Sequence, residues 1–238
     1  MTAPDPVRGA SEPPRDCPLC PRLVELRGEL RAEEPGWFNA PVPSFGAFDA
    51  RLVVVGLAPG LRGANRTGRP FTGDYAGDLL YETLLDFGFA RGSYQAAPDD
   101  SLTLVDCLIT NAVRCVPPQN KPTTPEIAAC RAFLRATLLT APRLEFVVAL
   151  GRIAHEQILR ALGGRLSAHP FAHGARHGLS GPDGRPLALF DSYHCSRYNT
   201  NTGVLTREMF RDVFAAARQT LDARKALGER GDQAASIS

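Results

Sequence analysis

The chain has 238 residues, of which 44% are hydrophobic and 22% charged, an ordinary composition for one globular domain or two small ones. The net charge of +2 excludes a domain that binds nucleic acid through overall basicity, so such binding would need a local basic patch. No apolar run approaches the roughly 20 residues of a membrane-spanning helix, and residues 1–16 lack a signal-peptide pattern, so we expect a cytoplasmic protein with no membrane partner.

The composition changes at both ends of the chain. Residues 1–16 are rich in Pro, Ala and charged residues, and we expect a disordered N-terminal extension there. Residues 224–238 end in Gly-Asp-Gln-Ala-Ala-Ser-Ile-Ser and are expected to be a disordered tail. Residues 17–223 are therefore predicted to form a single domain.

Four of the six cysteines form two separated pairs. Cys17 and Cys20 make a CxxC motif, and Cys115 and Cys130 flank a proline-rich loop far downstream. Structural disulfides are rare in the cytoplasm, and a CxxC pair brings two thiolates close enough to hold one metal centre. We therefore predict a four-thiolate site, which holds either zinc or an iron–sulfur cluster. Cys107 lies in an apolar run and is expected to be a buried core thiol.

Strand and helix patterns alternate along the rest of the chain. Near-continuous apolar runs predict buried strands at Leu52–Leu57, Leu104–Thr110, Glu145–Leu150 and Pro186–Phe190. Helical spacing of apolar residues predicts helices over 21–32, 75–88, 124–139, 152–162 and 206–223. This alternation is typical of a parallel sheet with helices on both faces, and such folds place their site beyond the carboxyl ends of the strands.

The loop after the first strand is rich in glycine. It begins Gly56-Leu57-Ala58-Pro59-Gly60, and its glycines let the backbone approach a ligand closely. The spacing fits neither a P-loop nor a dinucleotide fingerprint. Farther along, Phe71 is a candidate stacking platform and Asp74 a candidate carboxylate. Asp74 alone is better explained as the N-cap of the next helix.

Polar side chains also follow the second and fourth strands. Asn111 ends the second strand and can offer both a donor and an acceptor to a planar amide edge. His194 follows the fourth strand and can donate to a developing anion or carry a proton. Since the carboxyl ends of parallel strands share one edge of the sheet, we expect the two residues to face the same site.

At these residues the chain resembles the uracil-DNA glycosylase superfamily, specifically family 5, the B-type enzymes with an iron–sulfur cluster. The resemblance covers about residues 15 to 220 and is specific because four motifs occur together. They are the CxxC, Gly-Leu-Ala-Pro-Gly with Asn-Arg-Thr-Gly-Arg-Pro-Phe-Thr-Gly-Asp, Ile-Thr-Asn-Ala-Val-Arg-Cys-Val-Pro-Pro, and His194-Cys-Ser-Arg-Tyr-Asn-Thr-Asn-Thr-Gly. Family 4 has Glu where this chain has Leu57. Cys195 is a departure, since the family has Pro after the His.

The resemblance implies a three-layer α/β/α sandwich around a central four-stranded parallel sheet. It also implies a [4Fe–4S] cluster on Cys17, Cys20, Cys115 and Cys130, with a structural role; zinc is the alternative. The implied function is a monofunctional DNA repair glycosylase, expected to be a monomer, that excises uracil from duplex or single-stranded DNA. Hypoxanthine and xanthine are implied second substrates.

The resemblance further assigns roles within the site. Asp74 would position water or stabilise the sugar cation, and His194 would hydrogen-bond the carbonyl oxygen beside the glycosidic nitrogen. Ala58 stands where other families place a polar side chain that activates water, and it cannot act as a base. The predicted substrate-binding residues are Gly56, Ala58, Pro59, Gly60, Asn65, Phe71, Asn111, Arg197 and Asn199. Among these, Phe71 would stack on the base, Asn111 would read its amide edge, and Asn65 is a weaker candidate for holding water.

Three other functions stay open. A non-catalytic DNA-binding module of the same fold is the main alternative, motivated by Ala58 and Cys195. A zinc hydrolase acting on a small nucleotide is weaker, because four thiolates leave no open metal position. A redox sensor with the cluster as its switch is the last.

Overall fold

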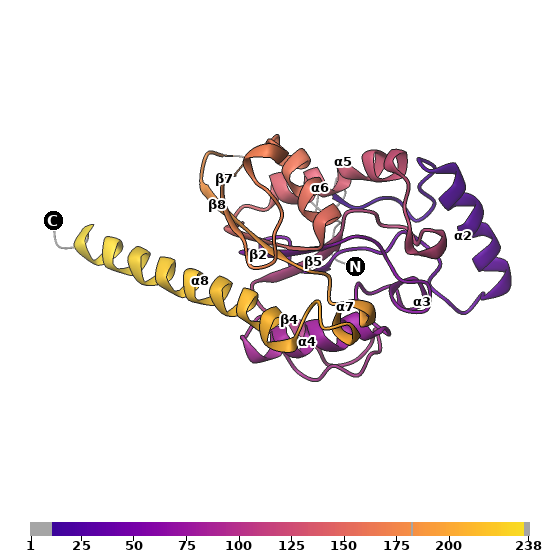
Figure 1. Ribbon diagram of the computed structural model, residues 1–238, viewed down its shortest axis with the longest axis horizontal. Coiled ribbons are helices and arrows are strands. Elements are labelled where there is room, and N and C mark those ends of the chain that lie inside the picture. Colours follow the sequence, from indigo (N-terminus) through magenta and orange to yellow (C-terminus); the bar gives the residue numbers. More distant parts are fainter. Residues whose placement is uncertain (1–10, 182, 236–238) are drawn as a thin grey trace, which may run out of the picture.

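The computed structural model describes residues 11–181 and 183–235, and its centre is a six-stranded sheet. The strand order is β1-β5-β2-β6-β8-β7. The four inner strands run parallel: β5 (Cys107–Asn111), β2 (Leu52–Gly56), β6 (Phe146–Leu150) and β8 (Pro186–Ser192). They confirm the predicted four parallel strands, and Figure 1 shows helices on both sides of them, as expected for three layers.

Two antiparallel edge strands extend the predicted sheet. They are β1 (Phe45–Gly46), beside β5, and β7 (Arg176–Ser180), beside β8. The first has only two residues, and the second reads Arg-His-Gly-Leu-Ser, so neither has the apolar run that marks a buried strand. The predicted strand 104–110 is in fact divided. Its first residue belongs to a separate hairpin of β3 (Ala90–Arg91) and β4 (Thr103–Leu104), and Asp106 turns the chain with a φ of 49° before β5 begins.

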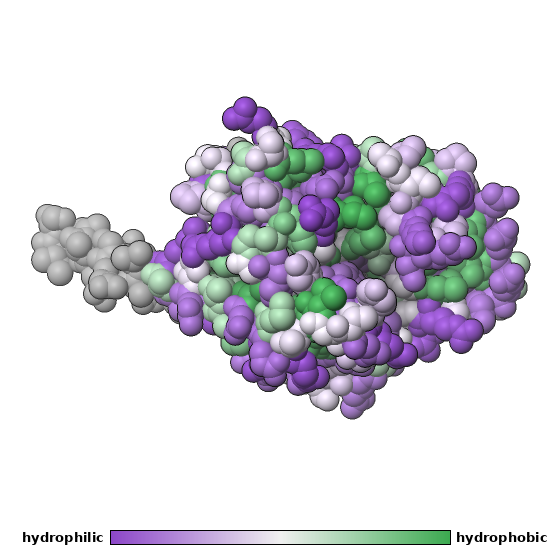
Figure 2. Space-filling model, in the orientation of Figure 1, coloured by the Kyte–Doolittle hydropathy of each residue, from purple (hydrophilic) through white to green (hydrophobic). Residues whose placement is uncertain are grey.

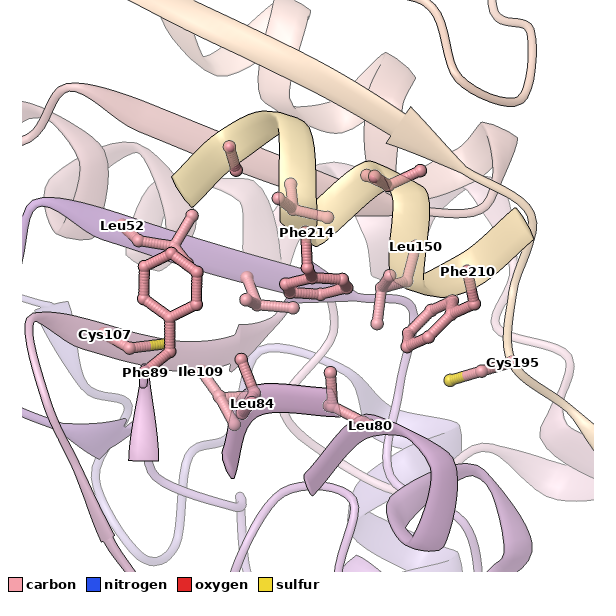
Figure 3. Close-up of a cluster of buried hydrophobic side chains, with 14 of the residues drawn as sticks. Leu52, Leu80, Leu84, Phe89, Cys107, Ile109, Leu150, Cys195, Phe210 and Phe214 are labelled. Carbon is pink, nitrogen blue, oxygen red and sulfur yellow. The ribbon is translucent and has the colours of Figure 1, made fainter. Parts of the chain in front are cut away.

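The helices form two layers because successive residues of each inner strand face opposite sides. Leu52 and Val54 of β2 pack under α4 and α8, whereas Val53 and Val55 pack under α5 and α6. The bounds are α4 Tyr75–Asp86, α5 Thr124–Thr140, α6 Arg152–Leu162 and α8 Arg207–Ala235. In Figure 3 the Phe210 and Phe214 rings of α8 point toward Leu80 and Leu84 of α4, and these side chains belong to one core cluster with Leu52 of the sheet.

The remaining helices lie outside these two layers or in the loops. They are α2 (Pro21–Glu33), α3 (Ala64–Thr67), α7 (Arg197–Asn201) and the 3-10 turns η1 (Pro118–Asn120) and η2 (Leu166–Ala168). The α5 helix begins at the predicted place, where Thr123 and Glu126 form a capping box. Figure 2 shows polar side chains over most of the visible face, with apolar ones in small patches. None of the helices in the described residues is both long and apolar enough to cross a membrane.

The two chain ends were expected to be disordered. Residues 1–10 lie outside the described part, but Ser11 and Glu12 contact the domain. A carboxylate oxygen of Glu12 accepts from Arg114 Nη1 at 3.0 Å, and the carbonyl of Ser11 accepts from Arg114 Nη2 at 3.3 Å. At the other end α8 continues past 223 to Ala235 and projects from the body, and residues 236–238 lie outside the described part (Figure 1). The division into one domain and two tails stays a prediction.

Candidate active site and metal centre

The loops after β2, β5 and β8 meet at the carboxyl edge of the parallel strands and enclose a cavity of about 600 Å³. This is the location expected for a ligand site in an open parallel sheet. Eight of the predicted site residues line it: Ala58, Pro59, Gly60, Phe71, Asp74, Asn111, His194 and Arg197. The structure therefore brings together residues that are up to 139 positions apart, from Ala58 to Arg197 (197 − 58 = 139).

Three predicted site residues do not line the cavity. Gly56 lies behind its wall, where a Cβ would stand 2.4 Å from Asn111 Oδ1 and 2.6 Å from Phe71 Cζ. Asn65 is buried in α3, and its side-chain amide donates to Asn39 Oδ1 at 2.9 Å. Asn199 donates to the backbone carbonyl of His194 at 2.8 Å, so its side chain braces the turn that carries His194.

Asp74 is the N-cap of α4, as its position predicted, and it also borders the cavity. Its Oδ1 accepts from the backbone amide of Gly77 at 3.2 Å. Its Oδ2 faces Gly60 and Gly63, since a Cβ on these glycines would lie 3.0 and 2.4 Å from that oxygen. Burial raises the pKa of the Asp74 carboxyl, although the backbone amides of Gly77 and Ala76 oppose the shift. The cap function and a role at the cavity are therefore compatible.

His194 faces the cavity as a neutral imidazole. Burial lowers its pKa to about 4, because the charged ring would lose hydration without gaining a partner. The ring lies nearly parallel to that of Phe71, with 6.1 Å between centroids and 28° between planes. At neutral pH the ring thus carries one N–H, which can donate a hydrogen bond but leaves His194 a poor source of protons.

Asn111 contributes a buried acceptor that has no partner. It ends β5 in register with Gly56 of β2, and its Oδ1 is one of the few buried side-chain atoms in the described residues without a hydrogen bond. A buried, unpaired polar atom is costly, and such atoms in folded proteins usually have a functional reason. Since Asn111 lines the cavity, the natural partner is a donor on a bound ligand.

Sequence reasoning missed seven residues of the cavity wall: Leu57, Ala64, Gly73, Tyr75, Ala76, Asn120 and Ser196. Five are direct neighbours of predicted residues and Ala76 lies two positions after Asp74, so closeness in the sequence was the available signal. The exception is Asn120, in the proline-rich loop, where it and Gln119 adopt φ values of 57° and 54°. Within the wall, the Arg197 guanidinium carbon lies 5.4 Å from the centre of the Tyr75 ring, which places a cation at the rim.

The four predicted thiolate ligands converge in a second, small apolar pocket. It is lined by Cys17, Cys20, Cys115 and Cys130, together with Leu23, Val113 and Phe133 among others. Cys17 and Cys130 are buried and the other two are half-buried. Burial raises the pKa of Cys115 to about 12 and that of Cys130 to about 11, so without a cation these thiols would stay protonated.

The hydrogen-bond donors around the sulfurs and the spacing between the sulfurs bear on which metal centre this thiol pocket could hold. Arg27 Nη1 donates to Cys115 Sγ at 3.9 Å, and the backbone amide of Arg114 donates to Cys130 Sγ at 3.3 Å. Among the described residues, no three of the four sulfurs lie within 4.8 Å of one another. Tetrahedral zinc with Zn–S bonds of ~2.3 Å would need sulfurs only ~3.8 Å apart. The sulfurs as they lie therefore do not match the spacing of one tetrahedral zinc ion.

A buried histidine–carboxylate cluster lies beside the site and was not predicted. Asp191 of β8 accepts from His155 Nδ1 at 2.7 Å and from His177 Nε2 at 3.0 Å. His155 Nε2 lies 2.9 Å from the carbonyl oxygen of His169, so both ring nitrogens of His155 face acceptors. The cluster ties α6, β7 and β8 together three residues before His194.

Comparisons with known proteins identify the family. The family model for the Uracil DNA glycosylase superfamily matches residues 43–218. A type-5 uracil-DNA glycosylase of Thermus thermophilus is 48% identical over 209 residues, covering 85% of this chain and 93% of the relative. Those of Pyrobaculum aerophilum and Mycobacterium tuberculosis are each 39% identical, covering 85% of this chain and 88% and 77% of the relatives. The chain therefore belongs to the uracil-DNA glycosylase superfamily, and within it to the type-5 group.

Proposed function

We propose that this protein is a DNA repair glycosylase that excises uracil by hydrolysing the N-glycosidic bond, leaving an abasic site. The observation that carries the proposal is the convergence of Phe71, Asn111 and His194 on one cavity at the carboxyl edge of the sheet. Its volume of about 600 Å³ suits a nucleobase with its sugar. A base can reach such a cavity only by leaving the helix, which costs a few kcal/mol and costs least for a mispaired base.

The flipped base would be held by a ring and an amide. Phe71 provides a flat surface, and base–aromatic stacking contributes about 1–3 kcal/mol. The unpaired Oδ1 of Asn111 would accept the N–H of the uracil amide edge. Hypoxanthine and xanthine carry the same arrangement of ring N–H beside a carbonyl, and the walls at Ala58 and Ala64 are small. We therefore propose both purines as further substrates.

His194 would stabilise the leaving base. As the glycosidic bond breaks, negative charge grows on the carbonyl oxygen beside the glycosidic nitrogen, and a preorganised donor there contributes about 3–4 kcal/mol. With its pKa near 4, His194 supplies that donor as a neutral ring. Transfer of a proton is not needed for this role.

Asp74 is the residue we propose for the water and sugar. Ala58 carries only a methyl group, and the side chain of Asn65 is turned toward Asn39. Of the described residues that line the cavity, Asp74 is the one with a carboxylate. It would orient the attacking water or stabilise the positive charge that develops on the sugar. Arg197, at the rim, would contact a phosphate, as Arg commonly does.

We further propose that Cys17, Cys20, Cys115 and Cys130 hold a [4Fe–4S] cluster. Because no three of the sulfurs lie within 4.8 Å of one another, their spacing supports this group over zinc. The donors from Arg27 and Arg114 would stabilise the thiolates. When bound, the cluster would cross-link the N-terminal segment to the segment that follows β5. The four cysteines lie outside the base cavity, which supports a structural role for them.

The test is a glycosylase assay on duplex oligonucleotides with one uracil, hypoxanthine or xanthine, read as alkali-labile breaks. Protein purified without oxygen should release uracil, and Phe71→Ala and Asn111→Leu should each lower the rate at least tenfold. Folded, iron-loaded protein that shifts DNA mobility but leaves no abasic site would instead support the alternative of a non-catalytic DNA-binding module. The preference for duplex or single strands, the monomeric state and the cytoplasmic location stay predictions.

A further inference from the structure

Phe71 adopts a backbone conformation that an aromatic residue rarely takes. Its φ is +52°, in the left-handed region, which is a genuine outlier for a bulky residue. Such conformations persist only where the surrounding structure imposes them, and they cluster at functional sites. Phe71 is also 93% buried, with its ring tip against Gly56. We therefore expect neighbouring side chains to impose this conformation on the segment.

Two tyrosine hydroxyls hold the main chain around Phe71. Tyr81 donates to the carbonyl of Pro70 at 2.6 Å, and Tyr94 donates to the carbonyl of Phe71 at 3.3 Å. The Tyr94 hydroxyl also accepts from the backbone amide of Gly73 at 3.4 Å. The carbonyls of Pro70 and Phe71 and the amide of Gly73 thus have side-chain partners.

A buried ion pair holds the two tyrosines in turn. Arg69 makes a bidentate pair with Asp100, with N–O distances of 2.7 and 2.8 Å, and the two side chains are 5% and 0% exposed. Its guanidinium carbon lies 5.4 Å from the Tyr81 ring centre and 5.8 Å from that of Tyr94. Arg69 Nε also donates to Thr72 Oγ1 at 2.7 Å, which adds a contact one residue beyond Phe71. Planar, charge-assisted pairs of this kind are specific in geometry.

None of these four residues lines the base cavity, and three of them hydrogen-bond to the segment 70–73 that carries Phe71. We propose that Arg69, Asp100, Tyr81 and Tyr94 form a clamp whose function is to position the Phe71 ring for stacking on the flipped base. This inference rests on the proposed function. The clamp residues are positioning residues, and their effect should appear in the chemical step rather than in binding of intact DNA.

The clamp is tested by two conservative substitutions. Tyr94→Phe keeps the ring over Arg69 and removes only the hydroxyl, and Arg69→Lys keeps the charge but loses the bidentate pair. The control is Arg51→Lys, the same change in an Arg that directly precedes β2, at the amino ends of the parallel strands and away from the cavity. Arg51 pairs with Glu145 at an N–O distance of 2.6 Å. Single-turnover rates on a uracil duplex and dissociation constants for the matched thymine duplex would be measured for each variant.

We expect Tyr94→Phe and Arg69→Lys to lower the single-turnover rate about tenfold, because misplacement by about 1 Å can cost up to 100-fold. Binding of the thymine duplex should be unchanged, and Arg51→Lys should cleave at the parental rate. In a Phe71→Ala background the Tyr94→Phe change should have no further effect, since residues acting through one group are not additive.

Parental rates for both clamp variants would overturn the inference, as would an undiminished effect of Tyr94→Phe in the Phe71→Ala background. That second result would mean that the hydroxyl acts through another group, such as the neighbouring Asp74. A parental rate for Phe71→Ala would overturn both the clamp and the stacking role of Phe71. Absence of uracil release by the unsubstituted protein would refute the proposed function itself, so the two failures are distinguishable.

Discussion

If neutral His194 is the donor to the leaving base, its contribution to catalysis should persist to unusually low pH. With a pKa of about 4, only about 9% of the ring is protonated at pH 5. A ring with the usual pKa of 6.5 would be about 97% protonated at that pH, leaving ~3% able to work as a neutral donor. The two cases differ about 30-fold (0.91/0.03) in the fraction of active ring at pH 5.

The measurement compares the parental protein with His194→Ala. Both retain Asp74, whose raised pKa will itself lower the rate in acid, so dividing one single-turnover rate by the other removes that effect. We expect a ratio of about 10²–10³ at pH 8, the usual cost of losing one oxyanion donor. Between pH 8 and pH 5 the ratio should fall by only about a tenth.

Two results would refute the reasoning. A ratio that falls about 30-fold between pH 8 and pH 5 would mean that His194 titrates near its usual pKa, so its burial does not suppress the charge. A ratio that rises toward acid would mean that the cationic ring is the active form. A thermal melt of both proteins at each pH would show that the comparison is made on folded chains.

Three other predictions test separate parts of the site. Gly56→Ala should lower the rate about 100-fold, because its Cβ would displace the two side chains it meets at 2.4 and 2.6 Å, whereas Gly178→Ala, with no atom within 4 Å, should cleave normally. Asp74→Asn keeps a good N-cap but loses the carboxylate, so it should fold with a normal melting temperature and lose at least 100-fold in rate; a normal rate would reduce Asp74 to a cap. Cys115→Ala should lose bound iron and acid-labile sulfide, measured per chain, and Cys107→Ala should retain both; zinc in their place would contradict the cluster.

The parts of the fold that the sequence predicted are those with one dominant local signal. The four inner strands are covered on both faces, so each is a continuous apolar run, as in Phe146–Leu150. The edge strand β7 has an alternating, half-exposed pattern and depends on pairing with β8, which no local signal reports. Asp106 lies between β4 and β5 with a φ of 49°, and Asp at a positive φ leaves no mark in the hydrophobic pattern.

The site residues that the sequence predicted correctly are polar residues at, or just after, the ends of the predicted parallel strands. Asn111 and His194 follow this rule, whereas Asn65 does not, because its partner Asn39 lies in a segment with no recognisable element. The cluster around Asp191 was missed for a related reason. His155 and His177 come from a helix and an edge strand, so their meeting depends on topology rather than on spacing in the sequence.

The thiol pocket and the base cavity share one stretch of chain, which connects the proposed cluster to base recognition. Cys115 lies four positions after Asn111, and the intervening Val113 donates its amide to the carbonyl of Leu57 at 2.9 Å, so this stretch is bonded to the glycine-rich loop. Beyond Cys115 the chain runs through η1 to Asn120 in the cavity wall.

The α2 helix, which directly follows Cys20, contacts the far end of the proline-rich loop that begins after Cys115. Arg22 donates to the carbonyl of Lys121 at 3.2 Å and pairs with Glu126 at 2.7 Å. Loss of the cluster would therefore release both ends of the segment that positions Asn111 and Asn120, while the two layers of the main core stay packed. On this reasoning a cluster ligand variant should lose selectivity for uracil before it loses its fold, because the cross-link acts on the cavity wall and not on the sheet.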